Sequence, residues 1–168
     1  MRISRCKMEA GLRIFDRSKK KKVLEMAEPY GIEELPYLLL QTSRKLRIFS
    51  GILSKDELFK WLRNIRIDNI GLYFASVDDS GMRFNLDAVH LLIEQIKGNV
   101  LEISDEQAER WFHGREIELN EYNKKEIEKK AVKEGFIILK NNGDFIGVGK
   151  LTKTIVLNYL PKERRIKN

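Results

Sequence analysis

The feature that most constrains the fold is a series of three strand-like runs that follow one another with no helix between them. The runs cover residues 136–140, 145–150 and 155–159. Residues 141–144 (Asn-Asn-Gly-Asp) are typical of a hairpin turn, and residues 151–154 supply the second turn. The sequence therefore predicts a meander of paired strands in the C-terminal half.

Two capping boxes mark the starts of helices. Ser54 is followed three residues later by Glu57, and Ser104 by Gln107, so each pair is expected to satisfy the first free N–H groups of a helix. Both helices carry apolar stripes at helical spacing that we expect to face a core: Leu58, Trp61, Leu62 and Ile65 in the first, and Ala108, Trp111 and Phe112 in the second.

Further elements are expected around these two helices. Helices are predicted from Ser18 to about Glu28, from Asn85 to a stop at Gly98 and across residues 121–134. In the helix after Asn85, four residues are expected to face inward: Leu86, Val89, Ile93 and Ile96. Strands are predicted from periodicity and from turn signals, namely the stretches around Leu46 and Ile48, 70–74, 82–84 and 100–103.

The mixture of helices and strands gives an α+β fold class. A boundary is predicted near residues 97–99, because Gly98 ends a helix and this stretch has no apolar residue. The expected organisation is a basic N-terminal arm over 1–17, an α/β domain over 18–97 and a second domain over 98–168. A chain of 168 residues is long enough to bury about 68–70% of the surface that it exposes when unfolded.

The positive charge is concentrated at the two ends of the chain. The net charge is +7, and residues 1–24 hold nine Lys or Arg against two acidic residues. Residues 145–168 hold six against one. Clustered positive charge suits a polyanion, because neutralised phosphates release their counterions. A solvated arm explains the N-terminal run equally well.

Several classes of protein are poorly supported. No apolar run approaches the length of a membrane span, and no signal peptide is apparent. The single cysteine, Cys6, favours a reducing cytoplasm. Together with His90 and His113 it provides too few metal ligands for a zinc finger, and it gives poor support to a thiol–imidazole enzyme. The segment GDFIGVGKLT is no phosphate loop, because Asp144 stands where a glycine is needed and Leu151 where Ser or Thr is needed. No cofactor, metal or catalytic residue is expected.

Other conspicuous residues have structural explanations. Trp111 and Phe112 match core spacing, and His90 and His113 suit helix surfaces or ends. The glycines at 147 and 149 indicate a strand that another chain approaches closely, and that chain is either protein or nucleic acid.

The C-terminal string NYLPKERRI is the most informative local feature. Pro161 ends strand pairing, and Lys162, Arg164 and Arg165 follow at short intervals. Guanidinium groups bind phosphate oxygens with two parallel hydrogen bonds, which favours a phosphate-binding role for the arginines. The alternative is a frayed basic tail.

The stretch from Val100 onward resembles a PUA domain: a strand, a helix that ends in Trp-Phe-x-Gly, then FIILKNNGDFIGVGKL and NYLPKERRI. Residues 21–96 resemble the pre-PUA domain of Nip-type ribosome-biogenesis factors, above all through IGLYFASVDDSGMRFNLDAVHLLIEQI. The C-terminal string is also similar to the accessory domain of Sun/Fmu-type RNA cytosine-5 methyltransferases. The resemblance implies a pre-PUA domain followed by a PUA pseudo-barrel. The expected helix at 121–134 departs from the family, because it is longer than the usual PUA connection, and it is expected to alter the RNA surface.

The resemblance also implies a function. It predicts a monomeric, cytoplasmic, non-enzymatic protein of ribosome biogenesis that binds structured rRNA or pre-rRNA, with no membrane contact. The alternative is an accessory or partner-dependent subunit of a methyltransferase-type rRNA-modifying enzyme, and a processing enzyme or a pre-ribosomal particle is a further expected partner. The expected RNA-binding residues are those at the family's RNA-binding loop and last strands: Gly114, Arg115, Gly149, Lys150, Lys153, Lys162, Arg164 and Arg165.

Overall fold

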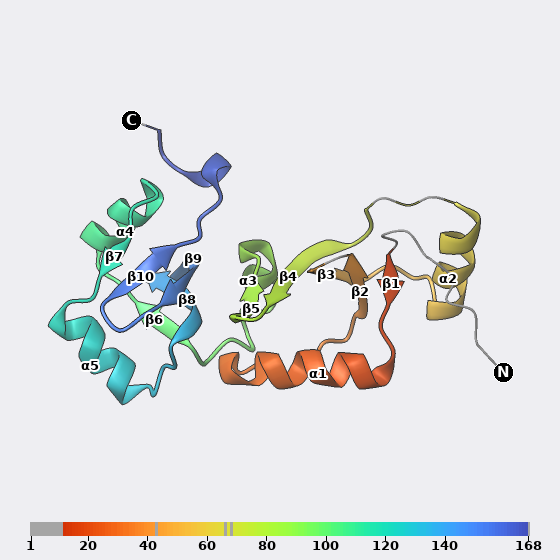
Figure 1. The fold of residues 1–168 in the computed structure, drawn as a ribbon, viewed down its shortest axis with the longest axis horizontal. Helices are drawn as coiled ribbons and strands as arrows, with labels where there is room; N and C mark the ends of the chain where they lie inside the picture. The colour runs from red at the N-terminus through yellow and green to blue at the C-terminus, as the bar shows by residue number, and fades with distance from the viewer. Residues whose placement is uncertain (1–11, 43, 66, 68, 168) are drawn as a thin grey trace.

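The computed structural model describes residues 12–42, 44–65, 67 and 69–167. Two β-sheets lie side by side along the long axis of the molecule, each with its own helices (Figure 1). This arrangement confirms the predicted α+β class with a pre-PUA-like part followed by a PUA-like part. Residues 1–11 of the predicted basic arm lie outside the described residues.

The first sheet is an antiparallel meander in which each strand pairs with the next along the chain. Its strands are β1 (Arg13–Ile14), β2 (Leu38–Thr42), β3 (Lys45–Phe49), β4 (Leu72–Asp78) and β5 (Gly81–Phe84). Three α-helices and a short 3-10 helix accompany it, namely α1 (Arg17–Ala27), η1 (Glu28–Tyr30), α2 (Lys55–Asn64) and α3 (Leu86–Leu91). Residues of α1 and α3 share one apolar cluster with the sheet, and α2 packs with β2 in a separate, smaller cluster.

The second sheet has the strand order β6-β8-β9-β10-β7. Its strands are β6 (Val100–Glu102), β7 (Ile117–Glu118), β8 (Gly135–Asn141), β9 (Asp144–Leu151) and β10 (Ile155–Asn158). The strands β8, β9 and β10 form the predicted meander, whereas β6 runs parallel to β8. The remaining elements are α4 (Asp105–Phe112), α5 (Glu121–Lys129) and η2 (Lys162–Arg164).

Strand β8 is buried on both faces, which explains its unbroken apolar run. Ile137 and Leu139 face a cluster that contains Trp111. Phe136 and Ile138 face the larger cluster formed mainly by the first sheet and its helices. A strand covered on both sides carries continuous apolar residues instead of an alternating pattern. The two halves of the chain therefore share one apolar core across β8 and β9.

Tyr30 of η1 ties the two halves together at the edge of this core. Its hydroxyl donates a hydrogen bond of 2.7 Å to the carbonyl of Phe136, and burial raises the pKa of Tyr30 to about 12. Its own carbonyl accepts hydrogen bonds from the N–H groups of Lys97 and Gly98. A Cβ at Gly98 would lie only 2.2 Å from the carbonyl oxygen of Pro29. The predicted junction at 97–99 thus packs closely on η1, and independent folding of the two parts stays a prediction.

Several expected helix details are wrong. The first helix begins at Arg17, because Asp16 rather than Ser18 accepts the capping hydrogen bond from the N–H of Lys19. Trp61 of α2 and the C-cap residue Ile65 are 51% and 52% exposed, although their spacing places them in the predicted stripe. The helix after Asn85 ends at Leu91, and the chain that follows buries Leu92 and leaves Ile93 47% exposed.

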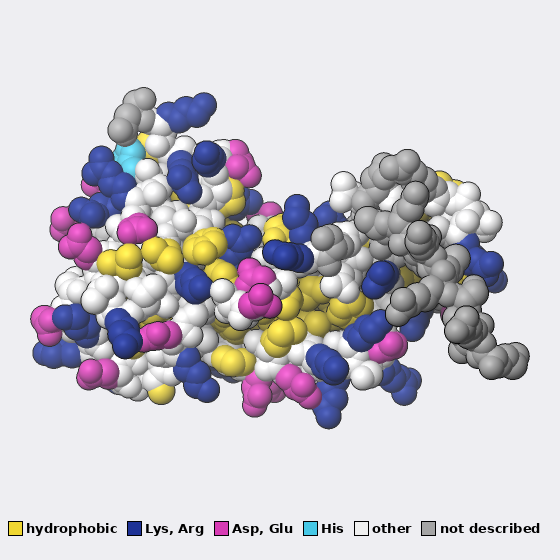
Figure 2. Space-filling model, viewed as in Figure 1, with side chains coloured by type: hydrophobic (Ala, Val, Ile, Leu, Met, Phe, Trp, Pro, Cys, Tyr) yellow, Lys and Arg dark blue, Asp and Glu magenta, His cyan; other side chains and the backbone are white. Residues whose placement is uncertain are grey.

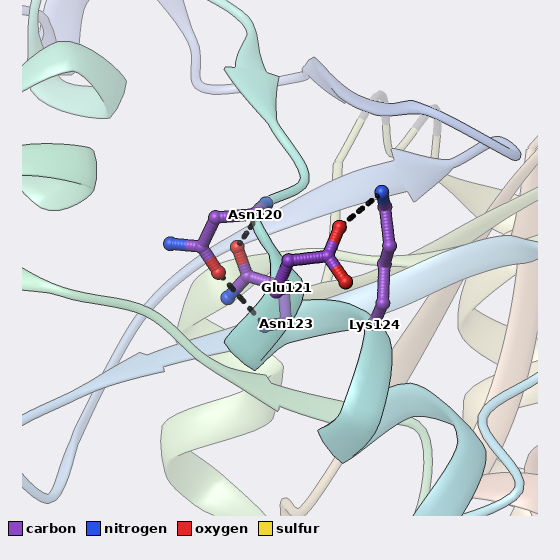
Figure 3. A network of polar contacts seen from close by, with 4 residues as sticks. All are labelled: Asn120, Glu121, Asn123 and Lys124. Atoms are coloured by element: carbon purple, nitrogen blue, oxygen red, sulfur yellow. Dashed lines mark hydrogen bonds and ion pairs between the residues drawn. The ribbon is translucent and has the colours of Figure 1, made fainter.

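Helix α5 ends at Lys129, five residues earlier than predicted, and it is fixed by a polar network at its start (Figure 3). Asn120 and Asn123 cap the helix reciprocally, and Lys124 pairs with Glu121 at 2.8 Å. Asn123 is fully buried and accepts a 2.7 Å hydrogen bond from Gln107 of α4. Gln107 and Asn123 thus hold α5 against α4. Helix α5 lies on the side of the second sheet away from the C-terminus (Figure 1).

Within the described part of the chain, every helix is too short or too polar to span a membrane.

Candidate nucleic-acid interface

The loop after α4 and the C-terminal segment lie against each other, and they hold five of the predicted RNA-binding residues. Gly114 has a φ of +77°, and the side chain of Arg165 covers it so closely that a Cβ would lie 2.7 Å from the arginine Cδ. The Nε of Arg165 donates to the carbonyl of Leu160 at 3.0 Å. Arg115 and Lys162 are exposed beside this contact. The segment is thus a docked structure rather than a frayed tail.

Arg164 links the C-terminal segment to the first half of the molecule. Its guanidinium lies 2.7 Å from a carboxylate oxygen of Asp87 in α3. This hydrogen bond holds the pKa of Asp87 below its usual value. Arg164 and Arg165 therefore both have structural partners, which reduces their freedom to bind phosphate.

Gly147 and Gly149 are approached by protein rather than by nucleic acid. A Cβ at Gly147 would lie 2.5 Å from Nε1 of Trp111, and one at Gly149 would lie 2.5 Å from a methyl group of Val156 and 3.1 Å from Trp111. Trp111 is fully buried, which confirms its expected core position. Because Gly149 is buried beneath these side chains, we do not carry it into the proposed RNA surface.

Lys150 and Lys153 have different surroundings from the C-terminal arginines. The Nζ of Lys150 donates to Ser80 in the turn between β4 and β5 at 3.0 Å and lies 5.9 Å from the ring centroid of Phe136. Lys153 is exposed in the turn between β9 and β10, at the opposite end of β10 from Pro161. Lys153 is therefore separated from Lys162, Arg164 and Arg165 by the length of β10.

The structure brings Lys150 together with residues that were not predicted from the sequence to bind RNA. We call the surface formed by Lys45, Tyr73, Arg83, Lys150 and Tyr159 the junction surface. The guanidinium of Arg83 lies 5.0 Å from the ring centroid of Tyr159, and Lys45 lies 5.4 Å from that of Tyr73. Tyr159 in turn stands edge-on to Phe136, with centroids 5.4 Å apart. These contacts interleave cations and aromatic rings across both halves of the chain.

Within the described part of the chain, the cations of the junction surface have few neutralising neighbours. Among the described residues, neither Lys45, Arg83 nor Lys150 forms an ion pair with a carboxylate. Arg83 donates from Nε to the hydroxyl of Ser76 at 3.3 Å, which leaves the outer edge of its guanidinium available. Asp78 and Asp79 lie in the same turn as Ser80, so some negative charge remains nearby.

A pocket of about 90 Å³ opens within this surface, at the place where the two halves meet. Tyr73, Arg83 and Asn85 line it from the first half, and Tyr159 and Pro161 line it from the second. Figure 2 shows a notch in the outline of the molecule between its two lobes, where Lys and Arg side chains gather. Among the described residues, no group of three His, Cys, Asp or Glu is placed to hold a metal ion.

A signal for the missed residues exists in the strand patterns. Arg83 stands between the buried Met82 and Phe84, and Lys45 precedes the buried Leu46. Alternation therefore places both cations on the outward face of the first sheet. What the sequence lacks is the information that this face lies beside Tyr159, 76 positions after Arg83.

Comparison with known proteins identifies the C-terminal part. Residues 98–166 match the family described as "Methyltransferase RsmF PUA domain". This part of the chain is a PUA domain that resembles the accessory domain of Sun/Fmu-type methyltransferases, which confirms the resemblance drawn from the sequence.

Similar full-length proteins share one description, "Ribosomal RNA small subunit methyltransferase F". The protein from Psychromonas ingrahamii is 26% identical over 141 residues, which cover 82% of this chain and 27% of that protein. The one from Shewanella oneidensis is 26% identical over 137 residues, or 82% and 26%, and the one from Vibrio parahaemolyticus is 26% identical over 113 residues, or 66% and 22%. The chain thus spans about a quarter of these relatives, and the similarity extends beyond the PUA domain into the first half.

Proposed function

We propose that this protein binds structured ribosomal RNA in ribosome biogenesis, through its PUA domain and the adjoining junction surface. The observation that carries the proposal is a set of cations on aromatic rings at the edge of a domain of the PUA type, without carboxylate partners among the described residues. The proposal is one of binding rather than chemistry.

The physical fit to RNA has two parts. Cations without carboxylate partners attract phosphates, and each phosphate they neutralise releases counterions. Half-exposed tyrosine rings offer flat faces on which unpaired bases stack. Because the cations and rings of the junction surface come from both halves, the first half is expected to add contacts to those of the PUA domain.

Fluorescence anisotropy with an rRNA hairpin and an unstructured strand of equal length tests this proposal. We expect tighter binding to the hairpin, with log affinity falling by about 0.7–0.9 per phosphate contact for each decade of salt. Equal affinity for the two RNAs and for heparin would indicate attraction between charges alone and would contradict the proposal.

A second candidate is that the chain supplies RNA recognition to a methyl-transferring catalytic domain. The relatives described as rRNA methyltransferases support this candidate, because the chain matches about a quarter of their length. On either proposal the isolated chain is not itself the methyltransferase. Calorimetric titration of the isolated chain with S-adenosylmethionine should therefore show no binding. Saturable binding of S-adenosylmethionine would contradict the proposal that the chain is not an enzyme.

Titrating the chain into a methyltransferase catalytic domain from one of the relatives separates the two proposals. An accessory role predicts a lower KM for rRNA with little change in kcat, whereas a protein that acts alone leaves both constants unchanged.

A further inference from the structure

The pocket between the two halves differs from the rest of the junction surface in what it offers to a ligand. It holds the two half-exposed tyrosines, Tyr73 and Tyr159, together with the guanidinium of Arg83. With a volume of about 90 Å³, it is far smaller than the roughly 300–1,000 Å³ of sites for drug-sized ligands. It therefore suits one planar ring rather than a base pair or a large cofactor.

Tyr159 and Arg83 are held in place before any ligand arrives. Tyr159 is 36% exposed, and its ring is fixed edge-on to Phe136 at an interplanar angle of 84°. Arg83 is positioned by Ser76 and by the ring of Tyr159. Fixed side chains lose little conformational entropy when they bind a ligand, which favours a specific contact over a diffuse one.

We infer that this pocket receives a single unpaired nucleotide of the RNA, with its base against Tyr159 and its phosphate at Arg83 and Lys45. The inference rests on the proposed RNA-binding function and adds the structural feature that the RNA must have. A base inside a duplex is stacked on both faces, so only a bulged, looped or terminal nucleotide offers a free face to the ring. An acidic peptide would use Lys45 and Arg83, which already cover one face of each ring, but would not use the ring faces that these cations leave open.

The test compares two RNA hairpins that differ only by one bulged adenosine. Wild-type protein should bind the bulged hairpin about 10-fold more tightly, within the range of about 1–3 kcal/mol that a stacked base contributes. Tyr159→Ala should abolish this preference, Tyr159→Phe should keep it, and the matched control Tyr122→Ala should also keep it. Tyr122 is an exposed tyrosine of α5, outside the pocket.

A second measurement guards against a Tyr159→Ala variant that folds poorly. With 2-aminopurine at the bulge, binding to wild-type protein should quench the fluorescence of that base, and binding to Tyr159→Leu should quench it less. Equal quenching by the two proteins, or a preference for the bulge that survives in Tyr159→Ala, overturns the inference.

The outcomes also separate this inference from the proposed function. If wild-type protein binds both hairpins equally but still prefers them to an unstructured strand, RNA binding stands and the pocket is not a nucleotide site. If neither hairpin binds more tightly than heparin or an acidic peptide, the proposed function itself fails.

Discussion

Two basic regions of the molecule hold their charge in different ways. In α1, Lys19, Lys20, Lys21 and Lys22 follow one another on a helix surface. On the junction surface, Lys45, Arg83 and Lys150 come from three different strands, and each lies on an aromatic ring. The first region is dense but local, and the second is sparse but assembled by the tertiary structure.

The difference shows that charge density alone is a poor guide to a binding site. The lysines of α1 lie near a helix N-terminus, where the macrodipole disfavours cations, and their ion pairs to Asp16 and Glu25 are long and exposed. Lys19 lies 5.9 Å from the ring centroid of Phe15 and Lys20 donates to the carbonyl of Tyr37, but all four lysines belong to one short stretch of helix. They therefore attract a polyanion from one place in the chain. The cations of the junction surface come from three strands and lie beside rings of both halves, so they are able to orient a particular RNA.

The largest expected effect comes from neutralising equal charge in the two regions. Arg83→Gln with Lys150→Gln, and Lys19→Gln with Lys22→Gln, each lower the net charge of +7 by two. We expect the junction pair to weaken hairpin binding by about 10-fold or more and to reduce the salt slope by about 1.4–1.8. The α1 pair should cost less than about 3-fold, because its contacts with phosphate are diffuse.

Anisotropy titrations at several salt concentrations measure both quantities. The contrast between the two regions is contradicted if the double substitution in α1 lowers affinity more than the double substitution in the junction surface. In that event the basic N-terminal region, which the sequence analysis also considered as an anion-binding arm, carries the binding.

The candidate site illustrates what a sequence can predict. The cations near the C-terminus were identifiable from their local density and from Pro161, but Arg164 and Arg165 prove to hold the C-terminal segment in place. Arg83 and Lys45 were visible only as polar positions in alternating strands. Their role depends on contacts with residues far along the chain, and no local pattern encodes such contacts.

The fold, like the site, was predictable where it depends on residues close in the chain and not where it depends on contacts between distant residues. The meander and both capping boxes were predictable, because turns and caps are set by residues within a few positions of one another. The two-residue strands β1 and β7 are too short to show periodicity. Trp61 belongs to an apolar stripe, but it remains exposed because the described structure places no element over that part of α2.

A smaller effect is expected from loosening the tie between the halves. Tyr30→Phe removes the hydrogen bond to Phe136 and should cost about 1–3 kcal/mol of stability. The junction surface needs both halves to keep their relative position. The preference for a bulged hairpin should therefore fall about 2- to 5-fold, which corresponds to a loss of binding free energy no larger than the loss of stability. Affinity for heparin, to which the α1 lysines contribute, should not change.

Alkaline unfolding supplies a control for the Tyr30 substitution. Unfolded tyrosine has a pKa of about 10, and burial raises the pKa of Tyr30 to about 12. The neutral hydroxyl therefore stabilises the fold fully below pH 10, and that stability is lost as the pH rises toward 12. Denaturant titrations should show a shallower loss over this interval in Tyr30→Phe than in wild type. Equal pH dependence in the two proteins would mean that this hydroxyl does not tie the halves.

A still smaller effect concerns the stability of α1 itself. Lys19 occupies the third helical position after the cap Asp16, where a glutamate completes a capping box and suits the helix dipole. Lys19→Glu should stabilise the protein by about 0.3–1 kcal/mol, which raises Tm by about 1–4 °C for a chain of this length. The control Lys22→Glu, farther from the N-terminus, should change Tm less. A lower Tm in Lys19→Glu would show that the lysine run stabilises α1, and the contrast between the two regions would weaken.

The smallest expected effect uses acid to compare one carboxylate from each part of the molecule. The capping hydrogen bond from the N–H of Lys19 lowers the pKa of Asp16, and the hydrogen bond from Arg164 lowers the pKa of Asp87. Each ionised carboxylate therefore adds stability that is present above the unfolded pKa of about 3.9 and is lost as the pH falls through the lower folded value. Below about pH 4 we expect both the start of α1 and the C-terminal segment to loosen.

Hydrogen exchange measured by NMR at pH 3 and pH 6 separates these two events. The N–H of Lys20, which bonds to the carbonyl of Asp16, reports on α1, and the N–H of Ile166, which bonds to the carbonyl of Phe112, reports on the C-terminal segment. Asp87→Asn should remove the acid sensitivity of Ile166 and leave that of Lys20 intact. If Ile166 in this variant keeps the wild-type protection at both pH values, the ion pair between Arg164 and Asp87 does not hold the segment, and Arg164 is free to bind phosphate as the sequence first indicated.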